Sequence, residues 1–213
     1  MARARGVDII GPMSVQAATA DEQLMHAYAG GDATAFETLY DRHAARVWRY
    51  ILRSTGDAAT ADDLAQEVWF SVARQAGQYA PRASAPGLPL ARFTTWLFTI
   101  ARHRVVDHLR ATRPQASLDA PVGDDTDQTL ADMLAAPSGF GPVRRIETRQ
   151  QAAQLLAALD ALPPEQREAF LLQAEADMSV ADIASTTGVP FETARSRLRY
   201  ARAALRRTLE TMA

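Results

Sequence analysis

Positive charge gathers in the segment 190–207, "PFETARSRLRYARAALRR", although the formal net charge of the whole chain is −2. The segment contains six arginines and one acid, Glu192. Arginine binds phosphate groups and is the side chain that most often reads guanine in the major groove. The alternative is a solvated helix face, but acids would normally alternate with bases on such a face. The segment therefore predicts a DNA-binding surface.

The same region has the spacing of a helix-turn-helix. Ser179 can cap a short helix, Gly188 can supply a turn with positive φ, and a second helix can begin at Phe191 or its neighbour. Four apolar residues recur at steps of three and four and predict a buried stripe: Ala194, Leu198, Ala201 and Leu205. Five polar residues fall outside this stripe and are expected to face DNA: Arg195, Ser196, Arg197, Arg199 and Arg202.

A second chemically distinct stretch is "ADDLAQEVWFSV", residues 61–72. Its apolar residues share one helix face: Ala61, Leu64, Ala65, Val68 and Val72. Its acidic and polar residues then point outward: Asp62, Asp63, Gln66 and Glu67. Such a patch indicates a protein partner with a complementary basic surface. The alternative is a solvated first turn that the helix dipole stabilises.

Aromatic and basic residues alternate in the stretch "FTTWLFTIARHRVVDHLR", residues 93–110. Phe93, Trp96 and Phe98 lie among four arginines, which are Arg92, Arg102, Arg104 and Arg110. Rings beside cations suit unpaired bases and their phosphates, through stacking and charge. The alternative is an aromatic stripe that belongs to the core.

These stretches require helices to position them, and the apolar spacing predicts an all-α fold. Gly30, Gly31 and Asp32 should separate a first helix from a second, with Asp32 as the N-cap. Gly56 and Asp57 should end the second helix, and Thr60 or Asp62 should cap the third. Prolines make residues 78–93 a loop, and a fourth helix follows over 94–113, where Pro114 stops it.

The chain divides into two small helical domains. Residues 1–20 are expected to be a disordered leader without the apolar region of a signal peptide. Residues 21–113 form the first domain and 144–213 the second, with a helix-turn-helix. Between them, residues 114–143 contain five aspartates and no basic residue, so we expect a flexible acidic linker with a short helical turn at 129–135.

Several functional classes are disfavoured. The chain has no cysteine, which excludes disulfides and thiolate metal sites. No nucleophile–base pair, glycine-rich phosphate loop or metal constellation occurs, so we expect neither an enzyme nor a cofactor. No apolar run approaches the roughly 20 residues that span a bilayer, so we expect no membrane insertion. The lack of cysteine fits a reducing cytoplasm, where we expect the protein to be located.

In their order, these stretches resemble the sigma-70 family, in its small two-domain extracytoplasmic-function (ECF) type. "GDATAFETLYDRHAARVWRYILR" resembles the opening helices of that family, and "ADDLAQEVWFSV" its segment that docks on RNA polymerase. "WLFTIARHRVVDHLR" resembles the segment that opens and holds the promoter −10 element. The stretch from "LPPEQREAFLL" to "RSRLRYAR" resembles the domain that reads the −35 element.

The resemblance implies a promoter-specificity subunit of RNA polymerase that melts DNA in transcription initiation. Its implied partners are the polymerase core (the β′ clamp helices and the β flap), promoter DNA and an anti-sigma factor wedged between the domains. The acidic patch defined above is the implied docking site on polymerase. The implied −10 contacts are Arg92, Phe93, Thr95, Trp96, Arg102, His103 and Arg110, where His103 replaces the family's usual Asn. Thr193 and Tyr200 join the five polar residues above as implied −35 contacts.

Two alternatives share parts of this pattern. A helix-turn-helix regulator without sigma activity would use the C-terminal domain alone. A sigma mimic that sequesters an anti-sigma factor would keep the fold, but it usually carries eroded DNA contacts and a receiver domain. Open-complex formation in a purified system separates the first alternative from a sigma factor.

Overall fold

The computed structural model describes residues 20–80, 90–112 and 149–211. Every regular element in these residues is a helix, as the sequence predicts. The first unit contains α1 (Asp21–Ala29), α2 (Ala33–Thr55), α3 (Ala58–Gln75), the 3-10 turn η1 (Ala76–Gln78) and α4 (Phe93–Thr112). The second contains α6 (Arg149–Asp160), α7 (Pro164–Ala176), α8 (Val180–Thr187) and α9 (Phe191–Thr211). The expected leader, most of the proline-rich loop, the linker and its helical turn lie outside the described residues.

The boundaries of α2 and α3 follow from local backbone chemistry. The Asp32 side chain accepts from the backbone N–H of Thr34 at 3.0 Å, which confirms it as the N-cap of α2. Gly56 ends α2 with φ at 79°, a left-handed conformation that glycine adopts without steric cost. The expected cap of α3 was wrong. Asp57 caps this helix by accepting from the N–H of Thr60 at 2.7 Å, so the helix begins one turn earlier.

The helix-turn-helix is formed by α8 and α9. Ser179 and Asp182 form a reciprocal capping box at the start of α8, in which each side chain accepts from the other's backbone N–H. Gly188 ends α8 at φ 70° and turns the chain toward α9. The predicted stripe is confirmed, because Ala194, Leu198, Ala201 and Leu205 are all buried.

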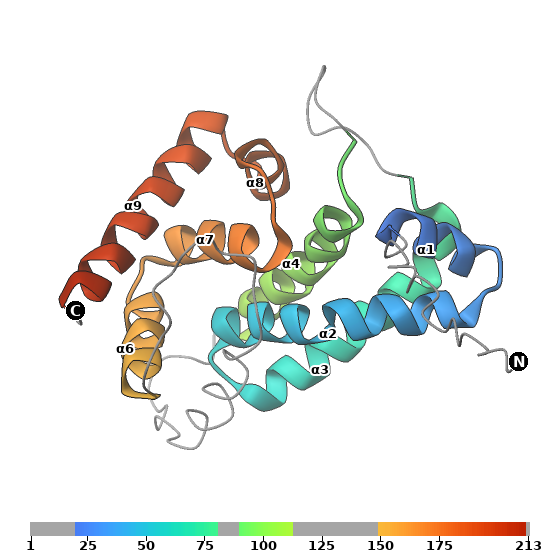
Figure 1. Ribbon diagram of the computed structural model, residues 1–213, viewed down its shortest axis with the longest axis horizontal. Coiled ribbons are helices and arrows are strands. Elements are labelled where there is room, and N and C mark those ends of the chain that lie inside the picture. The colour runs from blue at the N-terminus through green and yellow to red at the C-terminus, as the bar shows by residue number, and fades with distance from the viewer. Residues whose placement is uncertain (1–19, 81–89, 113–148, 212–213) are drawn as a thin grey trace, which may run out of the picture.

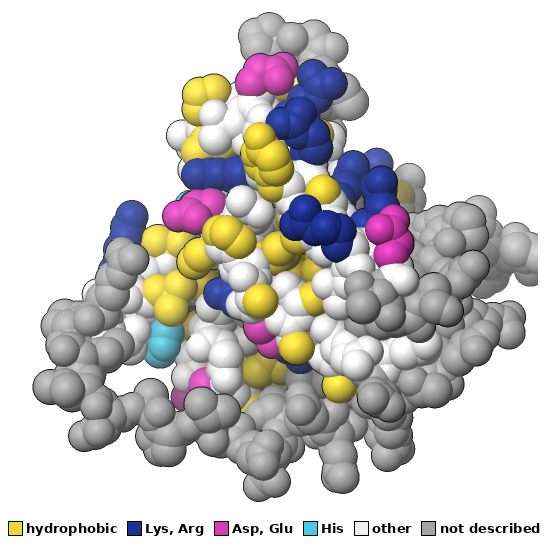
Figure 2. Space-filling view, turned by 90° about the vertical axis from the view of Figure 1, so that its left-hand side faces the viewer, with side chains coloured by type: hydrophobic (Ala, Val, Ile, Leu, Met, Phe, Trp, Pro, Cys, Tyr) yellow, Lys and Arg dark blue, Asp and Glu magenta, His cyan; other side chains and the backbone are white. Residues whose placement is uncertain are grey.

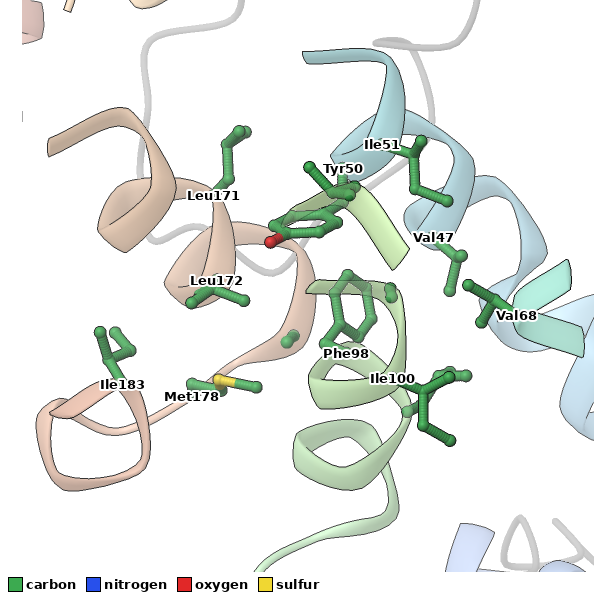
Figure 3. Packing of buried hydrophobic residues seen from close by; sticks show 14 of the residues in the cluster. Val47, Tyr50, Ile51, Val68, Phe98, Ile100, Leu171, Leu172, Met178 and Ile183 are labelled. Atoms are coloured by element: carbon green, nitrogen blue, oxygen red, sulfur yellow. The ribbon is translucent and has the colours of Figure 1, made fainter. Parts of the chain in front are cut away.

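The two units pack directly on each other, with α7 lying against α2 and α4 (Figure 1). Tyr50 of α2 and Phe98 of α4 are fully buried, with ring centroids 5.5 Å apart. They face Leu172 of α7, and Met178 and Ile183 continue the same apolar cluster toward α8 (Figure 3). Burying each such side chain contributes about 1.5–3 kcal/mol relative to exposing it. The described parts of the two predicted domains therefore share one hydrophobic core.

Within the described residues, no helix combines the length and the apolar character that crossing a bilayer requires. No group of three or more His, Asp or Glu side chains in these residues is arranged to hold a metal ion.

Candidate protein and nucleic-acid interfaces

The acidic stretch lies on the exposed side of α3. Asp62, Asp63, Gln66 and Glu67 are all exposed, while the opposite side of the helix packs into the core through Ala61, Leu64, Val68 and Val72. The fifth apolar residue of the predicted face, Ala65, is only partly buried. The structure thus brings the four predicted docking residues to one surface, which we call the acidic patch.

Two members of the acidic patch have partners within the chain. The Trp48 indole N–H donates to Oδ1 of Asp62 at 2.7 Å. Nη1 of Arg104 lies 3.6 Å from Oε2 of Glu67. Asp63 and Gln66 are left facing outward, with no such bond to a described residue. Their polar atoms are therefore available to an external partner.

A groove of about 560 Å³ adjoins the acidic patch between α2 and α3, and the sequence analysis did not identify it. Asp62 and Gln66 contribute to its lining, so the patch and the groove form one continuous surface. The rest of the lining is largely aromatic: Phe36, Tyr40, Trp48, Trp69 and Phe70. Phe70 is 59% exposed and Tyr40 45% exposed, which is unusual for large apolar side chains. The signal in the sequence is the pair Trp69-Phe70 directly after the acidic residues, of which the helix buries only Trp69.

Only some of the predicted −10 contacts on and next to α4 are exposed to solvent. Arg92, His103 and Arg110 are exposed, and Trp96 is partly buried. Phe93 and Thr95 require a correction, because they are 0% and 8% exposed and no external ligand reaches them in this conformation. Both side chains are packed inside the protein, Phe93 against the rings of His43, Tyr79 and Trp96, so they support the surface instead of forming it.

Behind this surface, α1 holds the start of α4. The Glu22 carboxylate accepts from the Phe93 backbone N–H at 2.8 Å, which satisfies a free donor at the helix N-terminus. The Tyr79 ring packs on Phe93 and Trp96, at centroid distances of 6.1 and 5.1 Å. Burial raises the pKa of Tyr79 to about 12, and the nearby carboxylates of Glu22 and Asp21 act in the same direction. Tyr79 therefore remains a neutral packing group at physiological pH.

Asp21 ties α1 to α2. Its two carboxylate oxygens bond Arg42 and the buried His43, each at 2.7 Å. Burial alone would raise the pKa of Asp21, but the hydrogen bonds and charges of His43 and Arg42 together outweigh it, so the pKa lies below its usual value. The charged form of Asp21 therefore stabilises the attachment of α1 to α2.

Arg102 differs from the exposed members of the predicted −10 set. It bonds Glu168 of α7 through Nε at 2.9 Å, and its side chain is 18% exposed. The second unit therefore covers Arg102 in this conformation.

Helix α9 presents the C-terminal basic face. Arg195, Arg199, Tyr200 and Arg202 are exposed, and Thr193, Ser196 and Arg197 are partly exposed at its flanks. Figure 2 views the molecule from the side on which α9 lies and shows arginine side chains spread over it with apolar groups between them. The Arg199 guanidinium lies over the Tyr200 ring at 4.9 Å from its centroid, and Arg202 donates to the side chain of Gln173. Arg195 lies 3.7 Å from Glu192 as well, so the expected face exists and three of its arginines have neighbours that orient them.

Two sigma-factor families match the chain. The family described as Sigma-70 region 2 matches residues 39–115, and Sigma-70, region 4 matches residues 152–205. The ECF RNA polymerase sigma factor SigL of Mycobacterium tuberculosis is 36% identical over 184 residues, which cover 86% of this chain and 94% of that protein. This chain belongs to the ECF group of the sigma-70 family. It is a sigma factor of transcription initiation, from a family of transcription regulators and not generally of enzymes.

Other relatives agree with this assignment. The ECF sigma factor RpoE of Cereibacter sphaeroides is 32% identical, over 80% of this chain and 83% of its own length. Two solved structures share the fold: CnrH in complex with the cytosolic domain of CnrY, and the sigma factor RpoE with the anti-sigma factor NepR from Bartonella quintana. Their TM-scores are 0.57 and 0.56, at 22% and 21% identity, and they cover 92% and 82% of this chain and 100% and 96% of their own.

Proposed function

We propose that this ECF sigma factor works by docking on RNA polymerase through α3, reading the −35 element with α9 and holding the opened −10 element with α4. Its site of action is the cytoplasm, where RNA polymerase transcribes. The observation that carries this division of labour is the presence of an exposed acidic patch on one unit and an exposed arginine face on the other. A protein that only bound DNA would have no use for the first.

The docking surface combines charge with apolar area. Asp63 and Gln66 offer polar atoms that no described residue bonds, and the adjoining groove offers the exposed rings of Tyr40 and Phe70. Interfaces place aromatic groups at the centre and polar groups at the rim. A helical partner with basic residues, such as the β′ clamp helices, would meet both parts. The β flap is the proposed contact of the C-terminal unit.

On α9, the exposed arginines supply both phosphate contacts and base readers. Helix-turn-helix proteins place the N-terminal part of the second helix at the base edges. Arg195 and Arg199 lie in this part and are exposed. Arg202, Ser196, Arg197, Thr193 and Tyr200 complete the proposed −35 surface.

The proposed −10 surface consists of Arg92, which directly precedes α4, and of Trp96, His103 and Arg110 on that helix, with Arg102 added when the units separate. Trp96 is the candidate for base stacking, because it keeps part of its ring exposed while Tyr79 and Phe93 support it from behind. Phe93 and Thr95 are proposed as its supports.

An anti-sigma factor is a further proposed partner. The solved structure of RpoE from Bartonella quintana, which shares the fold, is a complex with such a protein. In this chain α7 already packs on α2 and α4, so a partner that stabilises this arrangement would lie around the two units and not between them.

Promoter-directed transcription with purified polymerase core tests the proposal. We expect this protein to direct initiation from a subset of a promoter library and to make −10 thymines reactive to permanganate. A regulator without sigma activity would bind DNA but leave the −10 region paired. A sigma mimic would fail in both assays and would overturn the proposed function.

A further inference from the structure

Four arginines of the N-terminal unit meet four carboxylates of the C-terminal unit. Three of them lie on one face of α2 and the fourth lies on α4. We call the four arginines the arginine row. The pairs are Arg46 with Asp177, Arg49 with Glu175, Arg53 with Asp160, and Arg102 with Glu168. In every pair the cation comes from the first unit and the anion from the second.

The geometry of these pairs is that of strong ionic hydrogen bonds. The shortest N–O distance of each pair is 2.8 or 2.9 Å. Arg49 uses two nitrogens, with Nη2 and Nε at 2.8 and 3.1 Å from the two oxygens of Glu175. This two-pronged arrangement is also how arginine binds a phosphate group. The carboxylates thus stand where phosphate oxygens could stand.

The arginine row is largely covered in this structure, in which each of its members pairs with a carboxylate of the second unit. Arg53 is 11% exposed and Arg49 is 13% exposed. A cation that is this covered needs an anionic partner, since desolvation without one is costly. Arg53 uses Nη1 toward Asp160, and its buried Nε has no acceptor in the structure. Its hydrogen-bonding capacity is therefore not fully used by the carboxylate.

The arginine row lies next to the proposed −10 surface. Arg102 belongs to α4, and the Tyr50–Phe98 contact joins α4 to the face of α2 on which Arg49 and Arg53 lie. Removal of the whole second unit would therefore leave four cations beside the proposed −10 surface. These cations would lack their carboxylate partners, and a polyanion could replace them.

We propose that the arginine row is an additional binding site for the phosphates of single-stranded DNA, and that the carboxylates of the C-terminal unit occupy it until the two units separate. The inference rests on the proposed function in that it places this strand beside α4. The closed arrangement then inhibits DNA binding, and the strand and the second unit compete for the same four cations.

The test uses the full-length chain and neutral replacements of the carboxylates. The variant combines Asp160→Asn, Glu168→Gln, Glu175→Gln and Asp177→Asn; asparagine suits position 177, where φ is 53°. We expect its affinity for a mixed-sequence single-stranded oligodeoxynucleotide to rise at least about tenfold at low salt. Fluorescence anisotropy measures the affinity.

Two further variants make the result specific. A matched control removes four exposed acids elsewhere, with Glu37→Gln, Asp41→Asn, Glu165→Gln and Glu210→Gln, and changes the net charge equally. It should bind the oligonucleotide like the wild type. Adding Arg49→Ala and Arg53→Ala to the four neutral replacements should abolish the gain in affinity.

Förster resonance energy transfer between two dyes gives an independent measurement of the separation of the units. The chain has no cysteine, so Gln75→Cys and Ala203→Cys place dyes at two exposed positions on different units. The four neutral replacements should lower the transfer efficiency. The proposal is overturned if these replacements leave both the transfer and the oligonucleotide affinity unchanged, if the matched control gains equally, or if the gain survives loss of Arg49 and Arg53.

These measurements need no polymerase, so they fail independently of the proposed function. If the wild-type protein directs transcription but the oligonucleotide results contradict the arginine-row site, only the present inference is refuted. If the oligonucleotide results are as expected but the protein directs no transcription, only the proposed function is refuted.

Discussion

Asp63 is the residue at which polymerase docking can be tested most cleanly. It is exposed on α3 and makes no hydrogen bond or ion pair with a described residue, whereas Glu67 lies 3.6 Å from Arg104. Reversing Glu67 would therefore place like charges together inside the chain, and the effect on docking would be mixed with an effect on folding. Reversing Asp63 avoids this internal repulsion.

We expect Asp63→Arg to weaken binding to polymerase core at least about tenfold, or about 1.4 kcal/mol, because attraction across the interface becomes repulsion. Core binding measured by competition with a labelled sigma factor checks this. A folded Asp63→Arg protein with wild-type affinity would show that α3 does not dock.

On α9, Arg199 is the residue at which −35 recognition can be tested. Its guanidinium is positioned over the Tyr200 ring, so little conformational freedom is lost when it meets a base. We expect Arg199→Ala to cost roughly 1–3 kcal/mol in −35 binding and to relax the preference at one base pair. Arg206→Ala, about two helical turns further along, should weaken all sequences alike and reduce the salt dependence. Equal losses on cognate and mutated −35 sequences in the Arg199 variant would assign this residue to phosphate.

At the scale of elements, Gly188 sets the angle between α8 and α9. Its φ is 70°, and a Cβ at this position would meet no atom within 4 Å. Gly188→Ala therefore adds backbone strain without a clash, and we expect a loss of roughly 1–2 kcal/mol in the free energy of unfolding. Urea unfolding measures it. Gly77→Ala is the control, because the same space is open there and φ is not in the left-handed region. Equal effects of the two substitutions would contradict this explanation.

The attachment of α1 to α2 should depend on pH. The folded-state pKa of Asp21 lies below its unfolded value, which is about 3.9. The stabilisation that Asp21 contributes is therefore complete above about pH 4 and is lost as the pH falls through the lower folded-state pKa. We expect Asp21→Asn to lower the urea midpoint at pH 7, and the difference from wild type to shrink in acid. A difference that is constant from pH 7 to pH 2 would contradict the linkage.

The sequence predicted these elements well because their signals are local. The apolar steps in α3 and α9, the cap at Asp32 and the turn at Gly188 each depend on residues within a few positions of one another. The cap of α3 was misplaced because Asp57, Thr60 and Asp62 are all residues that favour N-caps, and only the backbone conformation selects Asp57. The burial of Phe93 likewise depends on the rings of His43 in α2 and Tyr79 after η1, which are distant from it in the sequence.

At the scale of the whole molecule, the arrangement of the two units could not be predicted from the sequence. Arg46 and Asp177 are 131 positions apart, and Arg102 and Glu168 are 66 apart. No periodicity in the sequence relates such distant residues. The sequence analysis consequently treated Arg102 only as a DNA contact and the two domains as separate bodies on a flexible tether. The structure adds a shared core and four ionic pairs between the units.

If the units must separate for function, a covalent link between α2 and α7 should inactivate the protein reversibly. Arg49 and Glu175 face each other across the interface, and the chain has no cysteine of its own. We therefore expect Arg49→Cys with Glu175→Cys, joined by a short bismaleimide that contains a disulfide, to lose promoter-directed transcription. Cleaving the linker with reductant should restore it to the level of the unlinked double variant, because α4 can then reach DNA and α9 can move independently. Full activity of the linked protein would show that the closed arrangement itself initiates transcription.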